Sequence, residues 1–199
     1  AGLAYSLAAG ARAMGVAIHE HTRVLGIDTE GEGLLRHVTR VRTDRGDIEC
    51  ELVVDCGGIY AAEIARMVGV RVPVVPMSHQ YVVTDPMFER RATPLPSLRD
   101  PDHLVYYRQE VDGLVWGGYE RNSAAWTASA SSYDAVPADF NGRLLPPDED
   151  RFAEIAEYAA LRVPAVAEAG IRTFINGPEA FTPDNEFCLG PTDVGGFFV

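Results

Sequence analysis

The sequence predicts a mixed α/β (α+β) fold, with βαβ-type elements followed by a domain built on an antiparallel sheet. Two observations carry this prediction. An apolar strand at Leu52–Val54 runs into Cys56-Gly57-Gly58 and then into a helix, an order typical of α/β domains that bind nucleotides. From Pro73 onward, short strand patterns alternate with polar, proline-rich connections, which favours an antiparallel sheet.

The first third of the chain is expected to contain alternating helices and strands. An alanine-rich helix at Leu3–Met14 ends at Gly15, and a strand pattern follows at Val16–Ile27. The other elements expected here are an antiparallel pair at 35–43 and 47–54, joined by Arg45-Gly46, and a helix at 59–68 that Gly69 ends.

The rest of the chain is expected to form the antiparallel domain. Its predicted strands are 80–84, 104–109, 114–119 and 171–176. Residues 122–147 are rich in Ser, Ala and Pro and are expected to form a long excursion. Residues 148–162 predict an amphipathic helix whose acidic start suits the positive end of the helix dipole. The predicted domains are 1–72, 73–181 and a return to the first domain at 182–199.

Composition excludes several classes of partner. A net charge of -12 and a pI near 4.8 argue against nucleic acid and against an anionic membrane surface. The sequence has no apolar run approaching the roughly 20 residues that a membrane-spanning helix needs. The 3 cysteines are too few and too scattered for a disulfide framework. His19 and His21 could share a strand face, but no third ligand follows at regular spacing, so no metal site is predicted.

Several motifs occur in an order that resembles one known family. They include Pro76-Met77-Ser78-His79-Gln80-Tyr81, Tyr106-Tyr107-Arg108-Gln109-Glu110, Gly117-Gly118-Tyr119-Glu120, Asn176-Gly177-Pro178-Glu179, Thr182-Pro183-Asp184 and Gly195-Gly196-Phe197-Phe198. Together with the glycine turn at Cys56-Gly57-Gly58, they resemble the D-amino-acid oxidase superfamily of FAD-dependent oxidoreductases. The resemblance is greatest to the dimethylglycine and sarcosine dehydrogenase branch. It implies FAD as cofactor, a Rossmann-like FAD-binding domain and an antiparallel-sheet substrate domain.

The same resemblance assigns cofactor-binding positions. Val24 would read the adenine through its backbone, and Cys56, Gly57 and Gly58 would lie along the ribityl or pyrophosphate side. Gly195 and Gly196 would approach the flavin ring from the other side. The Gly-x-Gly-x-x-Gly turn that opens such flavoproteins is missing from this sequence. The sequence is therefore expected to be an internal window of a longer enzyme that does not hold FAD by itself.

His79 and Tyr81 are the candidate catalytic residues. They lie two positions apart in a predicted strand and so share a face, where an imidazole and a phenol could orient or deprotonate an amine. The alternative is a tyrosine and a histidine packed at the edge of a sheet. The resemblance places this cluster near the catalytic cavity.

Arg108 and Tyr107 are the candidate substrate-binding residues. A guanidinium is the natural bidentate partner of a carboxylate, although Arg108 could instead be a surface cation paired with Glu110 or Glu120. Because neighbours in a strand face opposite ways, either Tyr106 and Arg108 or Tyr107 can face one cavity. Glu179 falls where glycine oxidases of the superfamily carry an arginine that grips the carboxylate, which disfavours that branch.

The predicted reaction is oxidation of the C–N bond of an N-methylated glycine, or a similar secondary or tertiary amine, by hydride transfer to flavin. The resemblance also suggests a folate or another electron acceptor as a partner. The expected location is the cytoplasm, or the mitochondrial matrix if the source is eukaryotic. Two alternatives belong to the same superfamily: a D-amino-acid or glycine oxidase, and a glycerol-3-phosphate-type dehydrogenase. A third, of another class, is a non-catalytic remnant without flavin.

Overall fold

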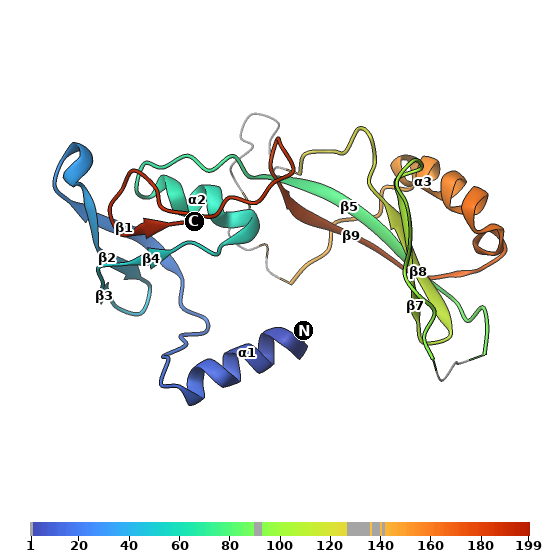
Figure 1. Cartoon of the computed structure of the whole chain (residues 1–199), viewed down its shortest axis with the longest axis horizontal. Coiled ribbons are helices and arrows are strands. Elements are labelled where there is room, and N and C mark those ends of the chain that lie inside the picture. Colours follow the sequence, from blue (N-terminus) through green and yellow to red (C-terminus); the bar gives the residue numbers. More distant parts are fainter. Residues whose placement is uncertain (1, 90–92, 127–135, 137–139, 141) are drawn as a thin grey trace. The chain divides into compact units, whose positions relative to one another are not determined.

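The chain divides into two compact units. A computed structural model describes residues 2–89, 93–126, 136, 140 and 142–199 (Figure 1). The first unit comprises Ala1–Cys56, Ile64–Val70 and Leu189–Val199, and the second comprises Gly57–Glu63 and Arg71–Cys188. The structure is mixed α/β with an antiparallel sheet, as predicted. The domain boundaries at 72/73 and 181/182 remain predictions.

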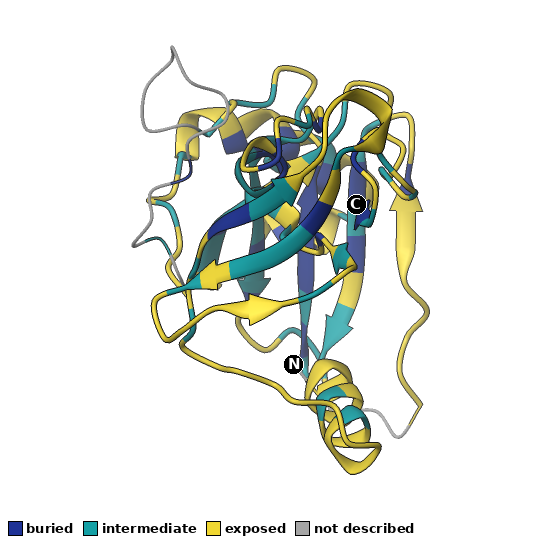
Figure 2. Ribbon diagram, turned by 90° about the vertical axis from the view of Figure 1, so that its left-hand side faces the viewer, coloured by how far each residue is buried: buried dark blue, intermediate teal, exposed yellow. Residues whose placement is uncertain are grey.

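The first unit contains a three-stranded antiparallel meander. Its strands are β1 (Val24–Glu30), β2 (His37–Thr43) and β3 (Ile48–Glu49), with the short helix η1 (Gly33–Leu35) between β1 and β2. The predicted strand at Val16–Ile27 is wrong over residues 16–23, because His21 has a left-handed φ of 54° that breaks an extended chain. Helix α1 (Gly2–Ala13) precedes it as predicted and is largely exposed (Figure 2).

Two distant segments of this unit form a parallel pair of strands. β4 (Val53–Val54) pairs with β10 (Phe197–Phe198), where Val53 N–H donates to Gly196 O at 2.8 Å and Phe197 is fully buried. The predicted pairing of 47–54 with 35–43 therefore holds only for β3, because β4 leaves the meander. After β4 the chain enters η2 (Gly58–Tyr60) and α2 (Ala61–Arg66), shorter than the predicted helix.

The second unit is built on a five-stranded antiparallel sheet with the order β6-β7-β8-β5-β9. The strands are β5 (Val75–Thr84), β6 (Leu98–Asp100), β7 (Val105–Glu110), β8 (Gly113–Gly118) and β9 (Ile171–Phe181). Four were predicted, but β5 and β9 are longer, and β6 was missed. β5 runs through Pro76, in a stretch that pairs with β9 and not with β8, where a missing N–H is tolerated.

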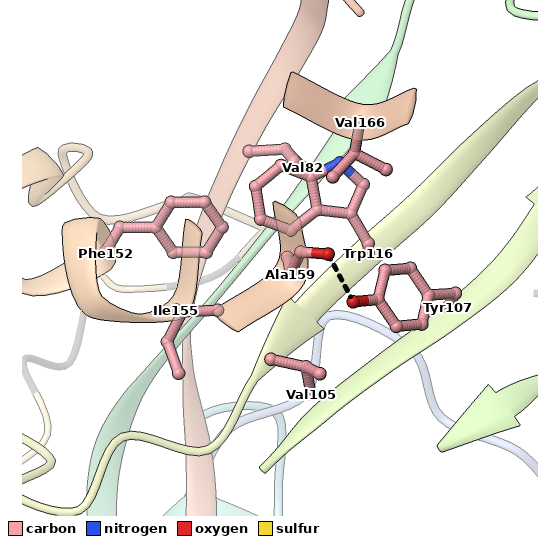
Figure 3. Packing of buried hydrophobic residues seen from close by; sticks show 8 residues of the cluster. All are labelled: Val82, Val105, Tyr107, Trp116, Phe152, Ile155, Ala159 and Val166. Carbon is pink, nitrogen blue, oxygen red and sulfur yellow. Dashed lines mark hydrogen bonds between the residues drawn. The ribbon is translucent and has the colours of Figure 1, made fainter. Parts of the chain in front are cut away.

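Helix α3 (Glu149–Arg162) covers one face of this sheet, and η3 (Pro164–Ala167) follows it. The helix begins where predicted: the Asp148 side chain caps it by accepting the Arg151 N–H at 3.2 Å. Phe152, Ile155 and Ala159 of the helix pack on Val82, Val105 and Trp116 of the sheet (Figure 3). Residues 127–135, 137–139 and 141 of the predicted excursion lie outside the described residues.

Gln80 fixes the start of this helix against the sheet. Its side chain is almost fully buried and bonds three ways: Nε2 donates to Glu120 Oε1 at 3.1 Å and to Asp148 O at 3.2 Å, and Oε1 accepts the Asp148 N–H at 2.8 Å. All of these partners lie on the side of α3. Because strand side chains alternate, the neighbours His79 and Tyr81 point to the opposite side, here called the open face.

Candidate active site

The open face carries a cross-strand row of side chains over three neighbouring strands. Tyr81 of β5 lies opposite Gly117 of β8, which lies opposite Tyr106 of β7. An added Cβ at Gly117 would come within 2.6 Å of Tyr81 Cβ and 2.9 Å of Tyr106 Oη. Gly117 therefore lets the two aromatic side chains approach one another above the middle strand.

His79 joins this row through contacts with two tyrosines. Its Nε2 lies 3.0 Å from Tyr106 Oη, within hydrogen-bond distance. Its ring stacks on Tyr119, just after β8, with a centroid separation of 4.6 Å and an interplanar angle of 25°. The opposite residue on β9 is Gly177, so the imidazole has no bulky cross-strand neighbour on that side. His79, Tyr81, Tyr106 and Tyr119 are called the aromatic cluster.

The protonation of the aromatic cluster follows from its partial burial. Burial lowers the pKa of His79, against the opposing charges of Glu179 and Glu120, so the imidazole is predominantly neutral near pH 7. Burial also raises the pKa of Tyr106, and that of Tyr119, so both phenols keep their protons. A neutral imidazole beside a protonated phenol can accept a proton from a bound group or hold a neutral amine by a hydrogen bond.

The structure separates Tyr107 from the other predicted site residues. Its ring is buried against α3, and its hydroxyl donates to Ala159 O at 2.9 Å (Figure 3). Tyr107 is thus a core residue on the face opposite to His79. The sequence allowed either Tyr106 with Arg108 or Tyr107 to face a cavity, and Tyr106 with Arg108 is the pair on the open face.

Arg108 is on the open face but is engaged elsewhere. Its Nη2 lies 2.9 Å from Glu110 Oε2, and its side chain is 62% exposed. This is the surface ion pair that the sequence left open as the alternative. Arg99 lies opposite Tyr106 on strand β6, which no sequence pattern predicted, and the sequence assigned no role to Arg99, Tyr106 or Tyr119. Strict strand alternation from His79 would have identified Tyr106 once the register was known.

A cleft opens beside the aromatic cluster. It has a volume of about 520 Å³ and is lined mainly by apolar side chains: Val75, Met77, Ser123, Ala125, Phe181, Thr182 and Pro183. Met77 shares a strand face with His79, and Phe181 meets Tyr119 edge-on at 6.3 Å. Glu179 lies opposite Met77, at the border between the cleft and the cluster. A small ligand could therefore have an apolar part in the cleft and a polar part at His79.

The predicted cofactor residues fall into two groups with different surroundings. Gly195 and Gly196 precede β10, where an added Cβ on Gly196 would lie 2.2 Å from Glu51 O, so backbone packing already requires this glycine. Cys56 is exposed beyond the other end of the parallel pair, after β4, and Gly58 follows with a φ of 57°. An added Cβ at Gly58 would have no atom within 4 Å, so its backbone is open to a ligand. Val24 opens β1 opposite Thr43. Cofactor roles for these residues remain predictions.

The described residues contain no group of three His, Cys, Asp or Glu side chains that could hold a metal ion. Among the helices that the structure describes, none has the length and apolarity to cross a membrane.

Comparison with known proteins gives the family. The family model of the FAD dependent oxidoreductases, DAO, matches residues 1–199. The chain belongs to this family of oxidoreductase enzymes. It is 36% identical over 201 residues to a mitochondrial sarcosine dehydrogenase of Mus musculus, covering 100% of this chain and 21% of that protein. It is 35% identical over 196 residues to a mitochondrial dimethylglycine dehydrogenase of Rattus norvegicus, covering 95% and 22%.

The chain is also similar to a protein named as a regulatory subunit and to a solved dehydrogenase structure. A mitochondrial pyruvate dehydrogenase phosphatase regulatory subunit of Mus musculus is 30% identical over 204 residues, covering 100% of this chain and 22% of that protein. The structure of an L-proline dehydrogenase from P. horikoshii matches with a TM-score of 0.76 at 23% identity, covering 96% of this chain and 46% of the other, which supports the fold. The chain thus spans about a fifth of the length of the curated relatives it matches.

Proposed function

We propose that this chain provides the substrate-binding face of an FAD-dependent amine dehydrogenase or oxidase. The reaction would be oxidation of the C–N bond of an N-methylated glycine, or a similar secondary or tertiary amine. The observation that carries the proposal is the contact of 3.0 Å between His79 Nε2 and Tyr106 Oη on the open face. The similarity to proteins named sarcosine and dimethylglycine dehydrogenases supports this substrate class.

The aromatic cluster would prepare the amine for oxidation. An amine can lose a hydride from its N-methyl carbon only while its nitrogen lone pair is free, so the substrate must be held in its neutral form. A neutral His79 can accept the proton of the ammonium form, and Tyr106 would hold the imidazole ring in place. The apolar cleft would receive the N-methyl groups and exclude water from them.

The cofactor would be FAD, which when bound accepts the hydride that the substrate loses. The open backbone at Gly58 is consistent with the close approach that a cofactor phosphate or sugar needs. Cys56 and Gly57 would lie beside it, Val24 would contact the adenine, and Gly195 and Gly196 would approach the flavin. Further partners would be the amine substrate and a folate or another electron acceptor. The site of action would be the cytoplasm or the mitochondrial matrix.

The test is anaerobic rapid mixing of the complete polypeptide that carries this sequence with sarcosine, dimethylglycine, glycine and D-alanine. We expect the methylated glycines to bleach the flavin absorbance much faster than glycine or D-alanine. Rapid bleaching by D-alanine with little by the methylated glycines would assign the protein to the amino-acid oxidases instead.

A second candidate function is a non-catalytic, regulatory one. It is favoured by the similarity to a protein named as a phosphatase regulatory subunit. The same purified protein distinguishes the two, because an enzyme of the first kind must carry flavin. A protein without flavin absorbance, which no added FAD restores, would support the regulatory function and exclude the first.

A further inference from the structure

A glycine-derived substrate carries a carboxylate, and the open face offers a cation for it in Arg99. Arg99 lies on the edge strand β6 and pairs with Tyr106 in the antiparallel register, so the two side chains share a face. The next residue, Asp100, points the other way, where it meets His103 Nδ1 at 2.9 Å and Arg162 of α3 at 3.6 Å. The alternation therefore places Arg99 on the open face beside the aromatic cluster.

Arg99 differs from Arg108 in its partners. Arg108 is held by Glu110, whereas Arg99 forms no ion pair with any residue that the structure describes. The positive charge of Arg99 acts on Tyr119, whose pKa it lowers against the larger effect of burial. Tyr119 in turn stacks on His79. The charge of the Arg99 guanidinium thus acts on the phenol that stacks on the candidate base.

The charges of the open face run across the sheet. Arg99 is on the edge strand β6, and Glu179 is on the opposite edge strand β9, with the aromatic cluster between them. The negative charge of Glu179 acts on His79, Tyr106 and Tyr119. A molecule with an anionic and a cationic end matches this polarity, and in a glycine derivative both ends lie within a few bonds of each other.

We propose that Arg99 binds the substrate carboxylate and thereby directs the amine toward His79 and Tyr106. This inference rests on the proposed function and names the residue that gives it specificity for amino acids. A guanidinium can bind both carboxylate oxygens through its planar fork, which an ammonium cannot do. Arg99 would take the place of the arginine that Glu179 replaces in the pattern of the glycine oxidases.

The test compares substrates with and without a carboxylate in the complete flavin-containing polypeptide. Arg99→Gln should raise the KM for sarcosine by roughly 10- to 100-fold, the loss expected for a hydrogen-bonded charge, and change kcat less. Arg99→Lys should lie between this variant and the wild type. The KM for N-methylethanolamine, which has no carboxylate, should stay within about twofold in both variants. Arg172→Gln removes a positive charge from the same sheet and is the matched control.

Binding of methoxyacetate, an unreactive carboxylate, provides a measurement independent of turnover. Its dissociation constant, measured by calorimetry, should rise in Arg99→Gln and not in Arg172→Gln. An equal effect of Arg99→Gln on both substrates, or loss of methoxyacetate binding only in Arg108→Gln, would overturn the inference. If the wild type binds methoxyacetate through Arg99 but oxidises no methylated glycine, the proposed function fails and the carboxylate site remains.

Discussion

The neighbouring tyrosines Tyr106 and Tyr107 should respond oppositely to loss of one oxygen atom. Tyr106→Phe removes the hydroxyl that lies 3.0 Å from His79 Nε2 on the open face. Tyr107→Phe removes the hydroxyl that donates to Ala159 O on the helix face. Both changes leave the ring in place, so packing is conserved and the two faces of the sheet can be compared directly.

For Tyr106→Phe we expect flavin reduction by sarcosine to slow by roughly 100-fold, the lower range for groups in general acid–base catalysis. For His79 to accept a proton at Nδ1, its own proton must lie on Nε2, which then donates to Tyr106 Oη. This bond is stronger in the cationic ring, so the pKa of His79 should fall further when the phenol is lost. The acidic limb of the pH profile should therefore move to lower pH.

For Tyr107→Phe we expect a change in stability and little change in turnover. The Ala159 carbonyl also accepts the Val163 N–H at 2.9 Å, so it keeps a partner when the phenol is lost. The free energy of unfolding should fall by about 0.5–1.5 kcal/mol, because the variant loses one hydrogen bond and leaves no buried polar group unpaired. This corresponds to a fall in Tm of roughly 2–4 °C per kcal/mol for a protein of this size.

Stopped-flow spectroscopy measures the rate of flavin reduction in both variants, and differential scanning calorimetry measures their Tm. Slower flavin reduction in Tyr107→Phe than in Tyr106→Phe would refute the assignment of the open face as the substrate face. Equal turnover by Tyr106→Phe and the wild type would remove the phenol from the mechanism.

Two further predictions follow from the sheet. Gly117→Ala should slow substrate oxidation at least tenfold and lower the free energy of unfolding by about 1–3 kcal/mol, because its Cβ would lie 2.7 Å from Gln80 O. Gly177→Ala should be tolerated, because the nearest contact of its Cβ is 3.9 Å away. Equal turnover and stability of the two variants would contradict this prediction. Asp100→Asn should lower Tm at pH 7. The His103 hydrogen bond lowers the pKa of Asp100, so the carboxylate stabilises the fold above its unfolded pKa and loses this effect as pH falls through the folded pKa. The difference in Tm between Asp100→Asn and wild type should shrink below about pH 4 and would count against the ion pair if it were constant with pH.

The parts of the fold that the sequence could predict are those with strong local signals. The helix at Glu149–Arg162 has a capping aspartate, an acidic first turn and an apolar stripe, so its start was predicted to within one residue. Strands β7 and β8 carry enough apolar and aromatic residues to be placed closely. The shared face of His79 and Tyr81 follows from alternation alone.

The parts of the fold that the sequence could not predict depend on contacts between distant segments. β6 has three residues and exists because it pairs with β7, so no local pattern identifies it, and Arg99 was missed with it. The choice between Tyr106 and Tyr107 depends on which face α3 covers, which is a property of packing. β4 pairs with β10 and not with β2 as expected. The sequence could not predict this pairing, because β10 lies more than 140 residues further along the chain.

The open face of the five-stranded sheet is the surface that we propose to hold the substrate. A crystal structure of the complete polypeptide with bound methoxyacetate would show whether the ligand lies there. We predict the ligand above Gly117, with its carboxylate on Arg99 and its methoxy group at His79 and Tyr106. Methoxyacetate bound away from this face, with the aromatic cluster making no contact to it, would contradict this assignment.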